Sequence, residues 1–471
     1  MYNNDTICAL ATAPGGALGI IRVSGPDAFP IVSSLCSVCC DRVEANSIHY
    51  TYIKDCEEVI DEVMVSVFRS PHSYTGENSV EISCHGSRYI LNKVLELLVK
   101  NGCRMAEPGE FTKRAYLNGK LDLSQAEAVA DLIASTNKAT HDIAMTQLRG
   151  HYSSEFKKLR DQLLKLTSLL ELELDFSDHE ELEFADRTEL LQLTQSIDER
   201  ITQLANSFKT GQALKEGIPV AIIGKTNVGK STLLNRLLKD DRAIVSDVHG
   251  TTRDTIEDVM TLHGVQFRFI DTAGIRQTTD EVEQIGIERT YAAIAKARII
   301  LWLIDTVPTE AEVKDITARA QGHALIPVFN KIDKYSTDAV PLKHSYALAA
   351  RPLDACDQNA PHSSLHPLIK ISAKKGLGIE HLETAIYHAA DIPTLSDTDI
   401  IVTNARHYEA LVKSQDSLRR VITALNMNIS GDLIAEDLRL VLSDLAEITG
   451  EGQITPQETL NNIFSLFCVG K

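Results

Sequence analysis

Eight consecutive residues near the middle of the chain, 224–231, read GKTNVGKS and match the pattern GxxxxGK[ST] of a phosphate-binding loop. They follow an apolar, strand-like run at 220–223 and precede a helix-like segment at 232–238. In that context, successive backbone N–H groups and the helix dipole converge on phosphate oxygens. We expect Lys230 to reach the β and γ phosphates and Ser231 to bind Mg²⁺, which predicts a nucleoside triphosphate site.

Two further segments carry groups that suit the magnesium ion and the γ-phosphate. Residues 271–274 read DTAG and follow a strand-like run, so Asp271 can reach the magnesium shell and the Gly274 N–H can reach the γ-phosphate. Thr251 and Thr252 lie in the loop between the phosphate-binding helix and that strand. A hydroxyl there, expected from Thr252, completes the magnesium shell only when a γ-phosphate is present, so this loop is predicted to be a switch.

The base is expected to bind at residues 330–333, which read NKID after the strand-like run 325–329. Asp333 offers two acceptor oxygens to the N1–H and N2–H₂ donors of guanine, and adenine has no such pair. Residues 372–374, SAK, follow another short strand and complete the base-binding loop. The predicted nucleotide is therefore GTP. The expected GTP-binding residues from these motifs are Val228, Gly229, Lys230, Ser231, Thr232, Thr251, Thr252, Asp271, Thr272, Ala273, Gly274, Asn330, Lys331, Asp333, Ser372, Ala373 and Lys374.

Hydrolysis of GTP requires a group that orients the attacking water, and Ile275 occupies the position where small GTPases commonly carry a glutamine. An aliphatic side chain cannot orient water. Glu283, in the following acidic stretch, is one carboxylate within reach, and a plain surface role for it stays open at this point.

The elements that position these residues show the alternation of strands and helices that is typical of a parallel sheet. Between residues 216 and 391, apolar runs alternate with amphipathic segments. Before them, residues 119–210 contain leucine, alanine, glutamate and lysine at helical spacing, and residues 392–471 return to that pattern. The sheet domain is therefore predicted to be inserted into a helical domain.

Residues 1–118 are punctuated by glycine and contain short β-like runs, which predicts a separate domain of mixed α and β structure. The expected fold class is a multidomain α/β protein. It combines an N-terminal α+β domain (1–118), a central all-α helical domain in two halves (119–210 and 392–471), and an inserted P-loop GTPase domain with a mainly parallel sheet (216–391).

Composition limits the partners and the location of the protein. The 471 residues carry a formal net charge of −18, so any contact with nucleic acid must be confined to local basic patches. The apolar runs are too short to span a membrane, and the polar first residues lack a signal-peptide layout, so we expect a cytoplasmic protein without membrane contact. The nine cysteines indicate reduced thiols, and Cys36, Cys39 and Cys40 lack the second pair that a zinc site needs.

These motifs, in this order, resemble the MnmE (TrmE) family of tRNA modification GTPases. The likeness extends over nearly the whole chain: GIIRVSG at 19–25, YTGENSVEI at 74–82, LNGKLDLSQAEAVADLI at 117–133, GTTRD at 250–254, DTAGIR at 271–276, and the terminal FCVGK at 467–471. The family pattern is interrupted at 338–367, where this chain has a longer segment.

The resemblance implies a homodimer that binds 5-formyl-tetrahydrofolate in an N-terminal folate-binding-like domain, with contacts at Arg22, Glu81, Lys120 and Lys471. It also implies activation by K⁺ when two G domains meet. The potassium ligands would be Asn227, Ser246, Val248 and Thr251, which also places Asn227 and Ser246 beside the GTP. The cation would offset charge that other GTPases neutralise with an arginine.

By the same resemblance, Glu283 becomes the water-orienting residue, catalytic together with Lys230, and Cys468 is required for tRNA modification but not for hydrolysis. The implied activity adds a carboxymethylaminomethyl group at C5 of the wobble uridine (U34) of certain tRNAs. It would be carried out as a heterotetramer with the FAD-dependent partner MnmG, with hydrolysis driving G-domain opening and closing.

Two other functions remain open on the sequence. A GTP-dependent ribosome-assembly switch that binds rRNA would be expected to carry a basic RNA-binding appendage, and none is visible in this acidic chain. A folate enzyme that is only regulated by its G domain would keep folate turnover when tRNA modification is lost.

Overall fold

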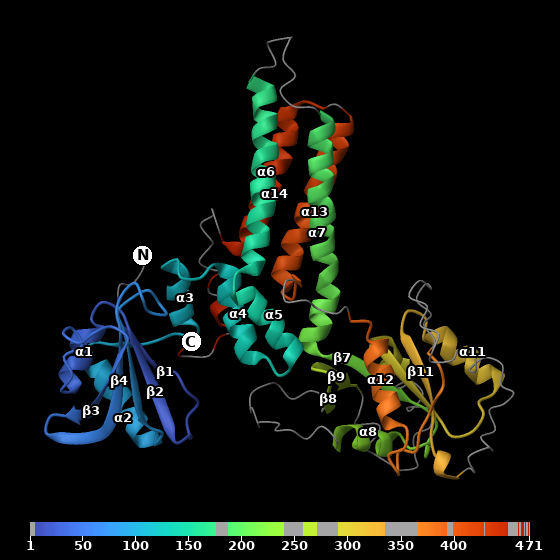
Figure 1. The fold of residues 1–471 in the computed structure, drawn as a ribbon, viewed down its shortest axis with the longest axis horizontal. Helices are drawn as coiled ribbons and strands as arrows, with labels where there is room; N and C mark the ends of the chain where they lie inside the picture. The colour runs from blue at the N-terminus through green and yellow to red at the C-terminus, as the bar shows by residue number, and fades with distance from the viewer. Residues whose placement is uncertain are drawn as a thin grey trace. The chain divides into compact units, whose positions relative to one another are not determined.

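The computed structural model describes residues 5–175, 187–239, 258–270, 291–334, 366–392, 399–427, 429–450, 460, 463–465, 467 and 470. The chain divides into two compact units. The first comprises residues 1–135, 141–205 and 404–471, and the second comprises residues 136–140 and 206–403. Figure 1 shows the elements of each unit along the chain.

The first unit begins with a six-stranded sheet of order β3-β4-β5-β2-β1-β6. Its strands are β1 (Ile7–Leu10), β2 (Leu18–Ser24), β3 (Ser47–Asp55), β4 (Glu58–Phe68), β5 (Ser79–His85) and β6 (Arg104–Met105). All neighbouring strands are antiparallel except β1 and β6. Along β4, Val63, Val65 and Val67 alternate with more exposed residues, so one face of the sheet is buried.

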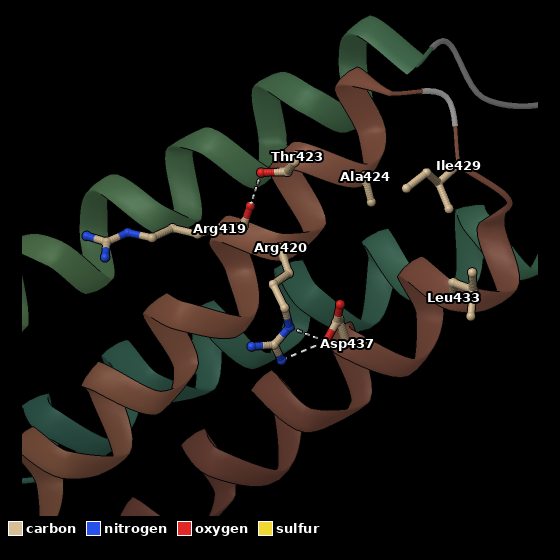
Figure 2. A pocket seen from close by; sticks show the side chains of 7 residues that line it. All are labelled: Arg419, Arg420, Thr423, Ala424, Ile429, Leu433 and Asp437. Carbon is tan, nitrogen blue, oxygen red and sulfur yellow. Dashed lines mark hydrogen bonds and ion pairs between the residues drawn. The ribbon is translucent and has the colours of Figure 1, made fainter.

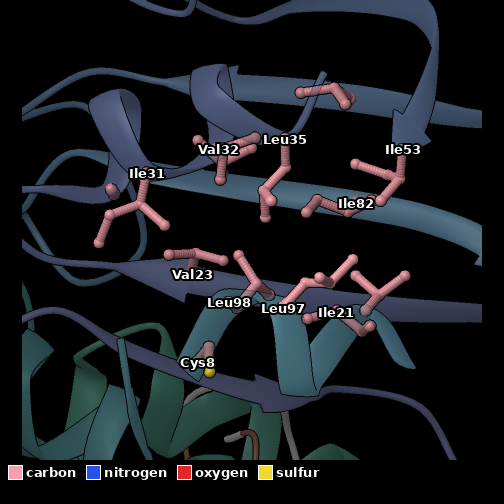
Figure 3. Packing of buried hydrophobic residues seen from close by; sticks show 14 of the residues in the cluster. Cys8, Ile21, Val23, Ile31, Val32, Leu35, Ile53, Ile82, Leu97 and Leu98 are labelled. Carbon is pink, nitrogen blue, oxygen red and sulfur yellow. The ribbon is translucent and has the colours of Figure 1, made fainter. Parts of the chain in front are cut away.

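Helices α1 (Ala28–Leu35) and α2 (Arg88–Lys100) supply the apolar side chains for that buried face. In Figure 3, Val32 and Leu35 of α1 and Leu98 of α2 gather with sheet residues such as Ile82 in one cluster. Each fully buried aliphatic side chain contributes about 1.5–3 kcal/mol, so this cluster is sufficient to hold the helices on the sheet.

The cysteines of residues 36–40 belong to this core and its margin. Cys36 Sγ donates to the carbonyl of Val32 at 3.3 Å, and burial raises the pKa of its thiol to about 11. Cys40 is fully buried and Cys39 is exposed. Among the described residues, no group of three or more His, Cys, Asp or Glu side chains is arranged to hold a metal ion.

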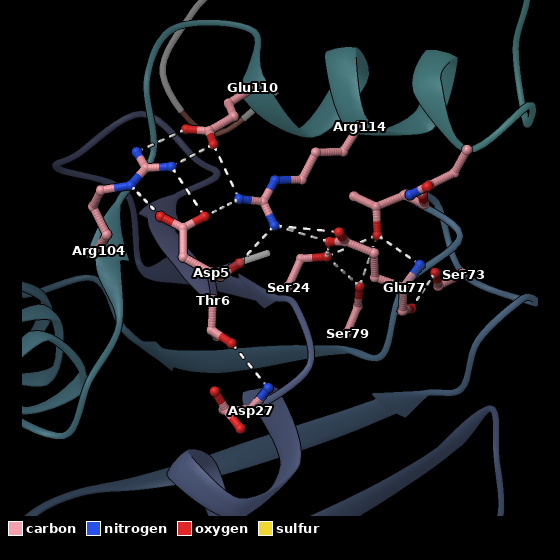
Figure 4. Close-up of polar contacts among 12 residues, drawn as sticks. Asp5, Thr6, Ser24, Asp27, Ser73, Glu77, Ser79, Arg104, Glu110 and Arg114 are labelled. Atoms are coloured by element: carbon pink, nitrogen blue, oxygen red, sulfur yellow. Dashed lines mark hydrogen bonds and ion pairs between the residues drawn. The ribbon is translucent and has the colours of Figure 1, made fainter. Parts of the chain in front are cut away.

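A buried ionic cluster ties α3 (Glu110–Leu117) to the sheet (Figure 4). Its centre is Arg114, which is 2% exposed and lies 2.7 Å from Asp5, 3.1 Å from Glu110 and 3.2 Å from Glu77. Arg104 pairs with Asp5 and Glu110 at 2.6 Å each. Because a buried cation is costly without partners, these carboxylates are what allow Arg114 to be buried.

The rest of the first unit is helical. The helices are α4 (Leu123–Ala134), α5 (Lys138–Leu148), α6 (His151–Asp175), α7 (Arg187–Glu216), α13 (Ala405–Asn426) and α14 (Gly431–Thr449), and the unit boundaries cut α5 and α7. Asp122 and Gln125 form a capping box at the start of α4, and Asn404 caps α13. Helix α14 packs against both α13 and α6. The two halves of the helical region, far apart in the sequence, therefore share one core.

A second buried polar cluster joins α4 to α13 inside this helical region. The Glu127 carboxylate lies 2.7 Å from His407 and 3.0 Å from Arg406, and the Tyr152 hydroxyl lies 3.1 Å from His407 Nδ1. Burial by itself raises the pKa of Glu127, but the attraction and hydrogen bonds of His407 and Arg406 outweigh it and lower the pKa to about 2. Glu127 is therefore ionised in the fold.

A shallow pocket lies between α13 and α14 (Figure 2). An ion pair of 2.7 Å between Arg420 and Asp437 runs along its wall, and Leu433 and Ile429 line its apolar part. The pair links the two helices.

The sheet of the second unit has the order β12-β11-β10-β7-β9-β8. Its strands are β7 (Ile218–Ile223), β8 (Asp258–Leu262), β9 (Val265–Phe269), β10 (Ile299–Ile304), β11 (Ala324–Phe329) and β12 (Ile369–Lys370). Four neighbouring pairs are parallel, and only β8 and β9 are antiparallel. The helices are α8 (Lys230–Lys239), α11 (Glu310–Arg319) and α12 (Ile379–Ala389), with a 3₁₀ turn η1 (Ile332–Lys334).

Strand β10 lies at the centre of this sheet, and all six of its residues are buried. It carries Trp302, the single tryptophan of the chain, which is 5% exposed and pairs in register with Ile223 of β7 and Pro327 of β11. Continuous burial fits a parallel strand covered on both faces, as the apolar run predicts. Within the described part of the chain, no helix has both the length and the apolar character needed to cross a membrane.

Candidate functional site

The phosphate-binding loop connects the end of β7 to the start of α8, as the sequence predicts. Gly224 has a φ of +147° and Gly229 a φ of +104°, and a Cβ on either would overlap a neighbour: the Leu303 carbonyl or the Asn330 amide. Asn227 has a φ of +61°, a conformation that asparagine tolerates better than most residues. The backbone shape of the loop therefore depends on these residue types.

Lys230 is the first residue of α8, and its ammonium lies over the loop. Nζ donates to the Gly224 carbonyl at 2.5 Å and to the Lys225 carbonyl at 2.9 Å. Burial lowers the pKa of this half-buried lysine. Ser231 and Thr232 follow in the first turn of α8, the first half-buried and the second exposed. A cation and a hydroxyl thus meet at the helix N-terminus, where an anion is favoured.

Asn330, at the end of β11, joins the phosphate loop to the base loop. Its side chain is 3% exposed, donates to the Val228 carbonyl at 2.9 Å and accepts from the Ala373 N–H at 3.0 Å. Because both groups of the amide are used within the protein, Asn330 fixes the distance between two loops that lie far apart in the sequence.

Lys331 makes a second link to the phosphate loop. Its Nζ donates to the Asn227 carbonyl at 2.7 Å and pairs with the Asp305 carboxylate at 2.7 Å. Asp305 follows β10 and was not among the residues predicted from the sequence, although a carboxylate just after a central strand was a usable signal. The pair holds Lys331 at the edge where β7, β10 and β11 end.

Asp333, the predicted base-reading carboxylate, lies in η1 and contacts the base loop. Its Oδ1 accepts from the buried Ser372 hydroxyl at 2.7 Å, and this hydrogen bond is the main cause of the lowered pKa of Asp333. The carboxylate is therefore ionised and oriented, as an acceptor for two N–H donors must be.

Several predicted residues lie outside the described residues. They are Ser246, Val248, Thr251 and Thr252 of the expected switch, Asp271, Thr272, Ala273 and Gly274 of the DTAG segment, Glu283, and Cys468 and Lys471 of the C-terminal motif. Most of the interrupting segment, 338–367, lies outside them as well.

In the first unit, two of the residues implied by the family resemblance lie face to face. Arg22 on β2 and Glu81 on β5 are directly opposite in register, and the guanidinium makes two hydrogen bonds to Glu81 Oε1, at 2.9 and 2.7 Å. The guanidinium also lies 5.4 Å from the Tyr74 ring centre and 5.5 Å from that of Phe111. A charged pair flanked by aromatic rings is suited to a flat, polar heterocycle.

Lys120 is exposed and donates to the Pro71 carbonyl at 3.1 Å, and Gly76 lies beside its side chain. The loop 71–76, which Lys120 contacts, also carries Tyr74, and the Tyr74 ring lies against the Arg22 guanidinium. Gly470 lies in the same region, since Arg22 Nη1 donates to its carbonyl at 3.5 Å.

Comparison with known protein families gives two matches that together cover most of the chain. The model described as "MnmE helical domain" matches residues 123–468, and the one described as "GTP-binding protein TrmE N-terminus" matches residues 6–120. The chain belongs to the MnmE family. Family membership agrees with the expected fold class, because the N-terminal domain, the helical domain and a mainly parallel GTPase sheet are all present.

Relatives in the MnmE family match the chain from end to end. Proteins named tRNA modification GTPase MnmE from Phocaeicola vulgatus and Bacteroides thetaiotaomicron are each 50% identical, with 100% of both chains covered. The protein of that name from Porphyromonas gingivalis is 47% identical over 100% of this chain and 99% of its own. Among solved structures, the G domain of the T. maritima FeoB iron transporter is 21% identical, covering 37% of this chain and 98% of its own, with a TM-score of 0.23.

A further contact in this MnmE-family chain, made by Arg236, was not predicted from the sequence. Arg236, a half-buried residue of α8, donates to the carbonyls of the base loop, to Lys374 at 3.0 Å and to Ala373 at 3.4 Å. No motif contains this arginine, and 137 residues separate it from Ala373, so only the folded arrangement identifies it.

Proposed function

We propose that this chain hydrolyses GTP to drive a step of tRNA modification. The observation that carries the proposal is the link between the two halves of the nucleotide site. Asn330 joins the phosphate loop to the base loop, and Ser372 holds the Asp333 carboxylate, which would read guanine. Membership of a family whose relatives are named tRNA modification GTPases supports the same function.

The chemistry follows from the residues of the phosphate loop. The Lys230 ammonium, held over the loop carbonyls, would exchange those contacts for β- and γ-phosphate oxygens and stabilise the charge that develops on them. The Ser231 hydroxyl, in the first turn of α8, would hold Mg²⁺, and Thr252 would complete the shell. The ion would supply positive charge that offsets the negative charge of the phosphates.

Potassium activation is part of the proposal. Asn227 has a left-handed backbone conformation, and Lys331 donates a hydrogen bond to its carbonyl, which supports that conformation in the loop. With oxygens of Ser246, Val248 and Thr251, this asparagine would hold K⁺, which supplies positive charge where other GTPases use an arginine. Glu283 would orient the attacking water.

In the first unit, we infer a folate site at Arg22, Glu81, Lys120 and Lys471. The Glu81 carboxylate suits the donor edge of a pterin, the neighbouring rings suit its faces, and the lysines suit the carboxylates of the tail. 5-Formyl-tetrahydrofolate would supply the one-carbon unit.

The proposed biological context is a cytoplasmic homodimer that joins MnmG in a heterotetramer. There it would install a carboxymethylaminomethyl group at C5 of the wobble uridine U34, with Cys468 serving the modification rather than hydrolysis. The G domains would open and close during the GTP cycle, and this motion would switch the assembly between an open and a closed conformation.

The test measures modification and hydrolysis on the same variants. Cells that lack this protein receive the wild-type chain, Glu283→Ala or Cys468→Ser, and wobble nucleosides are quantified by mass spectrometry. Glu283→Ala is expected to lose hydrolysis and modification, while Cys468→Ser keeps hydrolysis and loses modification. Normal wobble nucleosides in cells without the protein, together with a ribosome-assembly defect, would refute the proposal and favour a ribosomal switch.

A further inference from the structure

Arg236 connects the phosphate-binding helix to the base-binding loop. Its Nη2 donates to the Lys374 carbonyl at 3.0 Å and its Nε to the Ala373 carbonyl at 3.4 Å. The turn of the loop packs on the guanidinium, since a Cβ at Gly376 would lie 3.5 Å from Arg236 Cζ. One side chain therefore holds two consecutive peptides of the loop.

Holding the Ala373 carbonyl also determines where the Lys374 N–H points. The two groups belong to one planar trans peptide and point in opposite directions. With the oxygen held toward α8, the N–H is directed to the other side of the loop.

The neighbouring amides of the loop already have partners. Ala373 N–H donates to Asn330 Oδ1 at 3.0 Å, Lys375 N–H to Ser372 Oγ at 3.2 Å, and Gly376 N–H to the Ser372 carbonyl at 2.8 Å. Among the described residues, none accepts a hydrogen bond from the Lys374 N–H. Of the amides of residues 373–376, this one is left for a ligand.

The loop donor and the Asp333 acceptor belong to one connected arrangement, because Ser372 bridges the loop to Asp333 at 2.7 Å. Guanine presents an acceptor, O6, next to its N1–H and N2–H₂ donors on one edge, whereas adenine presents an N6–H₂ donor in place of O6. An N–H donor on the loop that also holds the Asp333 carboxylate would match guanine and oppose adenine.

We propose that Arg236 is a positioning residue for base recognition, which orients the Lys374 N–H toward the 6-oxo group of guanine. This inference rests on the proposed GTP function, and it assigns part of the base specificity to a residue outside the sequence motifs. Arg236 acts through the loop peptide and does not touch the base.

The test compares three nucleotides on the full-length chain: GDP, 6-thio-GDP and IDP. Sulfur is a weaker acceptor than oxygen, so 6-thio-GDP weakens the contact of the Lys374 N–H, while IDP lacks the 2-amino group that Asp333 reads. One neutral hydrogen bond corresponds to about a tenfold preference for GDP over 6-thio-GDP in the wild-type chain. Arg236→Ala is expected to reduce that preference to about twofold and leave the preference for GDP over IDP unchanged.

Three further variants complete the comparison. Asp333→Asn is expected to lose the preference for GDP over IDP and to keep the preference for GDP over 6-thio-GDP. Arg236→Lys keeps the charge with a single donor group and should fall between wild type and Arg236→Ala. Arg319→Ala removes an exposed arginine of α11 that pairs with Asp315, and should change neither ratio.

If Arg236→Ala weakens all three nucleotides by the same factor, Arg236 only stabilises the fold and the inference is wrong. If the wild-type chain binds none of the three, the proposed GTP function fails instead, so the two failures are distinct.

Discussion

Replacing Asn330 by alanine tests whether this residue works by joining two loops or by touching the nucleotide. The substitution leaves the Val228 carbonyl and the Ala373 N–H, both satisfied by a side chain that is 3% exposed, without their partner. Each lost hydrogen bond in a buried position costs about 1–2 kcal/mol, so the local opening of the base loop should become at least about 2 kcal/mol easier.

The assay is hydrogen exchange of the full-length protein without nucleotide, followed on peptides that cover residues 224–230 and 369–378. A change of 2 kcal/mol corresponds to about 30-fold faster exchange of protected amides, with the Ser372 N–H, bonded to the Leu377 carbonyl at 2.9 Å, as a suitable reporter. Dissociation of a fluorescent GDP should accelerate about tenfold in the same variant, because a loosened loop releases the base more readily.

The matched control is Asn235→Ala, which removes an exposed asparagine from α8 in the same unit. It should leave both measurements close to wild type, as surface substitutions generally do. Faster nucleotide dissociation with unchanged exchange in Asn330→Ala would refute the reasoning, because Asn330 would then act on the base directly.

Three other predictions concern the base, the cation and the helical region. Asp333→Asn should weaken GTP binding by about 100-fold or more and admit xanthosine triphosphate, as measured by competition, because an amide can donate where the carboxylate accepted. Replacing K⁺ by Na⁺ should reduce steady-state GTP hydrolysis by at least about tenfold with little change in GDP binding; equal rates in both salts would contradict potassium activation. Glu127→Gln should lower the unfolding free energy of the first unit at pH 7 by up to about 3 kcal/mol. Since the pKa of Glu127 is lowered to about 2, its stabilisation is present above pH 4.5 and is lost as the pH falls toward 2, so thermal melts of the variant should depend less on pH in that range.

The arrangement of the candidate nucleotide site follows largely from the sequence, because the predicted residues lie at the ends of strands in a fixed order. Apolar runs mark β7, β10 and β11, and the predicted residues Lys230, Asn330 and Ser372 follow β7, β11 and β12. Parallel strands end at one edge of a sheet, so sequence order alone brings these residues together. Strand β8 was not predicted, because its five residues at the sheet edge lack a clear alternation of buried and exposed positions.

The contacts that connect the motifs could not be predicted, because they join residues with no sequence relationship. Arg236 reaches the base loop across 137 positions, and Arg406 reaches Glu127 across 279. From the sequence, an arginine or a glutamate in an amphipathic helix is expected to lie on the solvent-exposed face. Only the packing of α4 against the start of α13 makes Glu127 a buried, ionised group.

The position of Trp302 has a practical consequence. As the chain contains one tryptophan, indole emission excited at the red edge of the absorption band originates from a single place, the middle of the second sheet. Trp302 pairs in register with Ile223, the last strand residue before the phosphate loop, so its emission colour reports whether water enters that sheet. Unfolding of the nucleotide-binding unit can therefore be watched in the intact, unlabelled protein while the rest of the chain stays optically silent.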